Sequence, residues 1–229
     1  MIRLALFDVD GTLIHTNGAG VAAFARALTS EFGVNQVAER IRFGGRTDIS
    51  LVREMFALAR IEPTRENIRR FFDSYAFWLD QLLAQTKGEV CPGVWPFIRG
   101  LQNLPSPPLI GLLTGNIRLG AEIKLRRFDL WNVFQTGAFA DDHEDRNQIA
   151  AVARERGGRI LNRKLPGDEI LVVGDTPHDI RCGRAIGAKA LAVATGGVTW
   201  EQLQAHEPDW LVRDLSEISA AQVCLQPQP

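Results

Sequence analysis

The sequence predicts an α/β fold in which a doubly wound parallel sheet carries one small helical insert. Three observations support this prediction. Short apolar runs recur along the chain and end in polar or glycine-rich residues, helical patterns lie between those runs, and one stretch near the N-terminus shows helical periodicity alone. The 229 residues are enough for one large domain, or for one domain with an insert.

Four apolar runs predict the central strands. They are short, rich in aliphatic residues, and bounded by turn residues, which is typical of strands that are buried on both faces of a parallel sheet. The predicted strands are Ile2–Phe7, Leu109–Leu113, Ile170–Val173 and Ala190–Val193.

Helical patterns follow these strands, or the links after them, at Arg118–Arg127, Arg146–Arg156 and Asp179–Ile186. Strands that alternate with helices indicate crossover connections and hence a Rossmann-like, doubly wound sheet. Ligands bind such sheets at the carboxyl ends of the strands. We therefore sought the chemistry of the protein in the residues directly after each strand.

The insert is predicted between residues 16 and 90, which leaves residues 1–15 and 91–229 as the core. Apolar residues recur there at helical spacing, no strand is expected, and glycines mark both ends. In the alternative interpretation, these helices pack on the sheet as part of one domain. We expect the polar tail, residues 226–229, to be frayed.

Composition argues against several partners. The formal net charge of −1 provides no overall field that would attract nucleic acid or anionic lipid, and no apolar run is long enough for a membrane span or a signal sequence. The three cysteines, Cys91, Cys182 and Cys224, are too scattered for a disulfide framework or a zinc site. We therefore expect a cytoplasmic protein, and the sequence leaves its oligomeric state open.

The first chemical motif is Asp8-Val9-Asp10-Gly11-Thr12, directly after the first strand. Alternation along an extended segment places the side chains of Asp8 and Asp10 on the same side. Two such carboxylates can serve as nucleophile and proton donor, or can supply oxygen ligands to a hard cation such as Mg²⁺. The alternative is a surface turn with two solvated acids, because Asp-Gly is a common turn signal.

The second motif is Thr114-Gly115-Asn116, after the strand Leu109–Leu113. A hydroxyl group and a glycine amide at a strand-to-helix junction can donate hydrogen bonds to phosphoryl oxygens. The alternative role of Thr114 and Asn116 is to cap the following helix.

The third motif, Gly174–Asp179, brings Asp175 to the same edge of the sheet. Three acids at adjacent strand ends would repel one another without a cation, which favours a metal-binding role for Asp175. Asp179 lies near the start of a helix, and either metal binding or bracing of the loop is compatible with its position.

Taken together and in this order, the three motifs resemble the haloacid dehalogenase superfamily, and within it the phosphoglycolate-phosphatase-like branch. The resemblance covers nearly the whole chain, including the helical insert and Cys91–Val94 at the return to the core. It implies a magnesium-dependent phosphatase that acts on a small phosphorylated metabolite, of the phosphoglycolate or sugar-phosphate type. The insert would be a mobile cap that excludes water.

The resemblance also implies residue roles. Asp8 would attack phosphorus and form an aspartyl phosphate, while Asp10 would protonate the leaving oxygen and then activate water. Mg²⁺ would be held by a carboxylate oxygen of Asp8, the backbone carbonyl of Asp10 and the carboxylate of Asp175. Thr114, with backbone amides such as that of Gly115, would bind the phosphoryl group, and we count Asn116 with them as a substrate-binding residue.

One position departs from the family pattern. The family places a lysine at the start of the helix before the last acidic motif, whereas this chain has Arg146 there. Arginine keeps the charge but differs from lysine in reach and geometry. We predict that Arg146 is the catalytic basic group and keep Lys164 as the alternative. In the insert, Arg46 of the loop Gly44–Asp48 is the candidate for substrate selection, and a solvated arginine beside a helix cap is its alternative.

Other functions were weighed against phosphatase activity. A sugar-phosphate mutase would have nearly the same core, and a non-catalytic phosphate-binding module would have degraded acidic motifs, which are intact here. The presence of Asp10 disfavours dehalogenation, because that reaction releases no alkoxide that needs a proton. The first strand is followed by no Gly-x-Gly-x-x-Gly motif, which disfavours a nucleotide-binding oxidoreductase.

Overall fold

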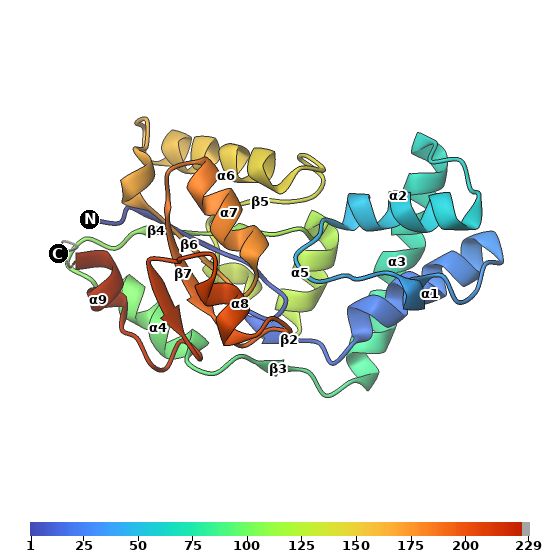
Figure 1. Ribbon diagram of the computed structural model, residues 1–229, viewed down its shortest axis with the longest axis horizontal. Coiled ribbons are helices and arrows are strands. Elements are labelled where there is room, and N and C mark those ends of the chain that lie inside the picture. The colour runs from blue at the N-terminus through green and yellow to red at the C-terminus, as the bar shows by residue number, and fades with distance from the viewer. Residues whose placement is uncertain (226–229) are drawn as a thin grey trace.

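The computed structural model describes residues 1–225, so the expected fraying of residues 226–229 lies outside the described part of the chain. Figure 1 shows two layers of helices around a central sheet, with a group of helices at one end of the molecule. The strands, in chain order, are β1 (Leu4–Phe7), β2 (Ile14–His15), β3 (Glu89–Val90), β4 (Leu109–Leu113), β5 (Thr136–Ala138), β6 (Ile170–Gly174), β7 (Lys189–Val193) and β8 (Trp210–Val212).

The helices alternate with the strands from β3 onward, whereas α1, α2 and α3 follow one another between β2 and β3. They are α1 (Ala19–Phe32), α2 (Asp48–Ala59), α3 (Arg65–Gln85), α4 (Val94–Gln102), α5 (Arg118–Arg126), α6 (Arg146–Ile160), α7 (Pro177–Ala185), α8 (Trp200–Gln204) and α9 (Ala220–Leu225). Short 3-10 turns lie at Ala38–Arg40, Trp131–Val133 and Gly167–Glu169. Within residues 1–225, no helix is both long enough and apolar enough to cross a membrane.

The main sheet has six parallel strands in the order β5-β4-β1-β6-β7-β8. Both faces of the sheet are buried at strand β1. Leu4 and Leu6 pack with residues of α6 and α7, whereas Ala5 and Phe7 pack with residues of α4, α5 and α9. Because β1 is buried on both faces, its sequence is continuously apolar and does not alternate. The predicted doubly wound α/β core with a helical insert is confirmed.

The four predicted strands correspond to β1, β4, β6 and β7, and the structure adds two short strands at the edges of the sheet. Strands β5 and β8 are three residues long. Each pairs with only one neighbour, so pairing across the sheet rather than local pattern decides their conformation.

Helices α1, α2 and α3 pack in a hydrophobic cluster around Phe24, Phe56 and Phe71, which also includes Ile117 and Ala140 of the core. The chain enters and leaves this group through β2 and β3, which pair antiparallel beside the core. The expectation that residues 16–90 contain no strand is therefore wrong for Glu89–Val90. Two residues are too few to show a period, and β3 forms because β2 lies beside it.

Gly93 begins α4 in the left-handed region, with φ of 78°. A Cβ atom at this position would lie 2.0 Å from the backbone nitrogen of Ser216, which no side chain could tolerate. Gly33 ends α1 with φ of 68°, but a Cβ atom there would meet no atom within 4 Å. A side chain at position 33 would therefore cause backbone strain alone, whereas one at position 93 would cause backbone strain and steric overlap.

We expect Gly93→Ala to lower the free energy of unfolding by more than about 3 kcal/mol, because it adds a backbone clash to the strain of positive φ. Gly33→Ala should cost only about 1 kcal/mol, the strain alone. Urea unfolding of the two variants measures the difference. Equal losses would show that the contact between α4 and the Ser216 loop does not constrain the fold.

Candidate active site

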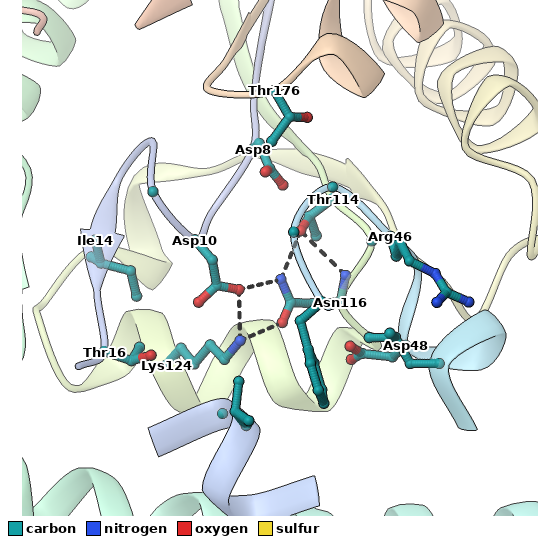
Figure 2. A pocket seen from close by; sticks show the side chains of 18 of the residues that line it. Asp8, Asp10, Ile14, Thr16, Arg46, Asp48, Thr114, Asn116, Lys124 and Thr176 are labelled. Atoms are coloured by element: carbon teal, nitrogen blue, oxygen red, sulfur yellow. Dashed lines mark hydrogen bonds and ion pairs between the residues drawn. The ribbon is translucent and has the colours of Figure 1, made fainter. Parts of the chain in front are cut away.

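A cavity of about 340 Å³ opens at the carboxyl ends of β1, β4 and β6. Asp8 and Asp10 line it from the loop after β1, and the intervening Val9 is buried in the core. Figure 2 shows the carboxylates of Asp8 and Asp10 as part of one cavity wall, as alternation along the segment predicts. Asp8 is buried, whereas the side chain of Asp10 is 43% exposed.

Asp8, Asp175 and Asp179 form the acidic cluster of the site. One carboxylate oxygen from each lies within 4.8 Å of the others, and all three side chains are buried. Burial and the charges of Asp179 and Asp8 raise the pKa of Asp175 well above its usual value. Burial is also the main reason that the pKa of Asp8 rises to about 6, against the lowering effect of Arg146. A set of oxygen ligands with this excess of negative charge fits a hard divalent cation.

Asp179 braces the loop between β6 and α7, which was one of its two predicted roles. Its carboxylate accepts hydrogen bonds from the backbone N–H and the hydroxyl group of Thr176, at 2.9 and 2.7 Å, and so caps α7. It also pairs with Arg146. One of its carboxylate oxygens also belongs to the acidic cluster with Asp8 and Asp175.

Arg146 is the first residue of α6, and its guanidinium group lies 3.1 Å from Oδ1 of Asp8. The side chain is 7% exposed and bridges Asp8 and Asp179, while its Nε has no hydrogen-bond partner within residues 1–225. Lys164 instead lines a separate cavity between the end of α6 and Ile186. The structure therefore places Arg146, and not Lys164, beside the predicted nucleophile.

Thr114, Gly115 and Asn116 follow β4, the neighbour of β1, and line the same cavity as Asp8. The Nδ2 group of Asn116 donates to Oδ2 of Asp10 at 2.9 Å and to the hydroxyl oxygen of Thr114 at 2.8 Å. Thr114 is completely buried, and Asn116 is 6% exposed. These bonds join the second motif to the first and hold the carboxylate of Asp10 in place (Figure 2).

Lys124 belongs to this network, and the sequence analysis missed it. Its ammonium group donates to Oδ2 of Asp10 and to Oδ1 of Asn116, both at 2.6 Å, and its side chain is 6% exposed (Figure 2). A signal for it exists in the sequence, because Lys124 shares a helical face with Ala121 and Leu125. A lysine that is buried on an apolar stripe of a helix needs an acidic partner within reach.

The loop before α2 reaches across to the core. The backbone N–H of Asp48 donates to the carbonyl oxygen of Gly115 at 2.7 Å, and the hydroxyl group of Thr47 donates to the carbonyl oxygen of Glu144 at 2.9 Å. A Cβ atom on Gly115 would lie 2.2 Å from the carbonyl oxygen of Arg46. Glycine at position 115 is therefore required by the close approach of this loop.

Arg46 lines the cavity, but its guanidinium group forms an ion pair with Glu54 and donates to the carbonyl oxygen of Ser50 at 3.3 Å. Figure 2 shows its side chain extending away from Asn116 and Lys124. The role of Arg46 in substrate selection stays a prediction, and in this conformation its charge is compensated by Glu54 of α2.

Asp48 and Tyr75 are two further cavity residues that the sequence analysis did not single out for function. Oδ2 of Asp48 accepts a hydrogen bond from the backbone N–H of Ile117 at 2.8 Å, and burial raises the pKa of this carboxyl group to about 7. The hydroxyl group of Tyr75 is buried and has no hydrogen-bond partner within residues 1–225. Both residues sit in helices of the insert, so only folding brings them to the core motifs.

Comparison with known proteins agrees with this geometry. The family model described as haloacid dehalogenase-like hydrolase matches residues 5–193. A curated relative, the probable phosphatase IndB of Dickeya dadantii, is 27% identical over 226 residues, which cover 96% of this chain and 94% of that protein.

Two solved structures share the fold. CbbY of Rhodobacter sphaeroides, solved in complex with phosphate, superposes with a TM-score of 0.77 at 17% identity and covers 98% of this chain and 99% of its own. The β-phosphoglucomutase of Clostridium difficile superposes with a TM-score of 0.74 at 15% identity, covering 97% and 96%. With its family model spanning five of the six strands of the main sheet and all three acidic and polar motifs, the chain belongs to the haloacid dehalogenase-like hydrolases.

Proposed function

We propose that this chain is a magnesium-dependent phosphatase that hydrolyses a small phosphorylated metabolite through an aspartyl phosphate on Asp8. The observation that carries the proposal is the pairing of Asp8 with Arg146 at 3.1 Å, on the wall of a small cavity that also contains the acidic cluster. A carboxylate, a fixed guanidinium group and a cation site together fit the attack on a phosphoryl group. The IndB relative, a probable phosphatase, supports the same reaction class.

The reaction has two balanced steps. A carboxylate oxygen of Asp8 forms a bond to phosphorus as the bond to the leaving oxygen breaks, and Asp10 gives its proton to that oxygen. Asp10 then accepts a proton from the water that attacks the acyl phosphate, which releases inorganic phosphate and restores Asp8. The ion pair and hydrogen bonds that Asp10 makes with Lys124 and Asn116 support this role, since they fix the direction of its carboxylate.

The remaining site residues would bind the phosphoryl group and the metal ion. Arg146 would compensate the charge of Asp8 and of the phosphoryl oxygens, and Thr114, Gly115 and Asn116 would contribute polar contacts from the loop after β4. The carboxylates of Asp8 and Asp175 and the backbone carbonyl of Asp10 would hold Mg²⁺. When bound, the ion would neutralise charge on the transferred group.

We further propose that residues 16–90 act as a cap over residues 1–15 and 91–229, and that the protein works in the cytoplasm, where its three free, buried thiols stay reduced. A sugar-phosphate mutase is the second candidate, because the fold is shared with β-phosphoglucomutase. Net release of inorganic phosphate distinguishes a phosphatase from a mutase, and a non-catalytic module would release none.

Purified protein should release inorganic phosphate from a panel of phosphorylated metabolites when Mg²⁺ is present, and excess chelator should stop the reaction. Asp8→Asn should lower kcat by at least about 10³-fold while the protein stays folded, because an amide cannot form the acyl phosphate. Near-native turnover by folded Asp8→Asn protein, or full activity in chelator, would exclude this mechanism.

Arg146→Ala should lower kcat/KM by about 10²-fold or more, because the charges of Asp8 and the phosphoryl group would lose their fixed counter-charge. Lys164→Ala is the matched control, and it should retain activity because Lys164 lines a different cavity. The opposite ranking in steady-state kinetics would assign the basic group to Lys164 instead of Arg146.

Lys124→Met should lower kcat by about 10- to 100-fold while changing KM less, because Asp10 would lose the charged donor that holds it for proton transfer. Lys164→Met makes the same substitution away from the site and should be silent. A change in KM alone would instead assign Lys124 to substrate binding.

A further inference from the structure

The part of the cavity formed by the insert contains polar groups that the proposed reaction does not use. Asp48 from α2 and Tyr75 from α3 lie there with Phe24, Phe43 and Leu51. In Figure 2, Asp48 lies with Lys124 on the side of the cavity away from Asp8. When a phosphate ester is bound with its phosphorus at Asp8, its leaving group would lie on this side of the cavity. Asp48 and Tyr75 are therefore placed to contact the leaving group.

Tyr75 offers a hydrogen-bond donor with no partner. Its hydroxyl group is buried and unpaired within residues 1–225, which is costly unless a ligand completes the bond. Burial and the negative charges of Asp48 and Asp10 raise the pKa of the phenol well above its usual value, so the group stays protonated. A ligand atom here must therefore be able to accept a hydrogen bond.

Asp48 offers an acceptor on the same side. The hydrogen bond that it receives from Ile117 ends on Oδ2, and no bond to Oδ1 is found in residues 1–225. When Asp48 is ionised, a ligand group beside its Oδ1 must be able to donate a hydrogen bond. A carboxylate or a phosphate dianion cannot donate, and the ionised Asp48 would repel either one.

The cations of the cavity do not favour a second anion either. Among the described residues, the lysine and arginine side chains that line it are Lys124, Arg146 and Arg46. Each already forms an ion pair. Lys124 pairs with Asp10, Arg146 pairs with Asp8 and Asp179, and Arg46 pairs with Glu54. An alkylammonium group would meet Lys124 and could not accept from Tyr75. An aliphatic hydroxyl group both donates and accepts, and it alone among these groups satisfies both residues.

We propose that Asp48 and Tyr75 select substrates whose leaving group is an uncharged, hydroxylated alcohol, as in a polyol or sugar monophosphate, over phosphate esters with a second anionic group. This inference rests on the proposed phosphatase function and chooses between the two substrate types expected for it. The cavity of about 340 Å³ lies at the small end of ligand sites, which fits a small metabolite.

Three phosphate monoesters with six carbons test the proposal: sorbitol 6-phosphate, 6-phosphogluconate, in which a carboxylate replaces the terminal hydroxymethyl group, and hexyl phosphate, which lacks the hydroxyl groups. The kcat/KM for sorbitol 6-phosphate should exceed both others by at least about tenfold, the effect of one hydrogen bond gained or one acceptor left facing an anion. Equal or better use of 6-phosphogluconate or of hexyl phosphate would overturn the proposal.

Two nearly isosteric variants test whether Asp48 and Tyr75 cause the substrate preference. Asp48→Asn should reduce the discrimination against 6-phosphogluconate by about tenfold, and Tyr75→Phe should reduce the preference over hexyl phosphate by a similar factor. Asp73→Asn removes a carboxylate from the exposed face of α3, where it pairs with Arg69, and should leave both ratios unchanged. Unchanged ratios in Asp48→Asn and Tyr75→Phe would also overturn the proposal.

Acetyl phosphate separates this inference from the function on which it rests, since its leaving group is small and carries no hydroxyl groups. If the wild-type protein hydrolyses acetyl phosphate but none of the six-carbon esters, the selection proposal fails and the phosphatase function stands. If it releases phosphate from neither acetyl phosphate nor any ester with Mg²⁺ present, the proposed function itself fails.

Discussion

The interaction on which the site depends is the bridge that Arg146 makes between Asp8 and Asp179. Three buried carboxylates gather where strands β1 and β6 end, and their mutual repulsion would oppose folding without a counter-charge. Arg146 supplies that charge from the first turn of α6. Its planar guanidinium group contacts Asp8, the predicted nucleophile, and Asp179, the residue that caps α7. One side chain therefore holds both Asp8 and the loop between β6 and α7.

A second polar network in the same cavity holds Asp10. Lys124 and Asn116 hold Asp10, while Arg146 holds Asp8, although the two aspartates are only two residues apart. The two carboxylates therefore stand in different environments, one buried against a guanidinium group and one partly exposed beside an ammonium group. Different environments are what allow paired carboxylates to take different roles.

The insert completes the site by means of its backbone as well as its side chains. Hydrogen bonds from Asp48 and Thr47 reach carbonyl groups of the core, and Gly115 permits this approach because it has no side chain. The same loop carries Arg46, whose charge is directed to Glu54. The cavity is thus lined both by residues of the core and by residues of the insert.

The sequence by itself determined the strands β1, β4, β6 and β7 and the placement of Asp8, Thr114 and Asp175 at one edge. Buried strands and their polar ends are local signals, and parallel strands bring their carboxyl ends together. Only the tertiary structure decided the strands β3, β5 and β8, which are too short to show a period and depend on their neighbours. It also decided the contacts of Lys124, Asp48 and Tyr75 with the motifs, because which face of a helix meets a cavity is set by packing between distant segments.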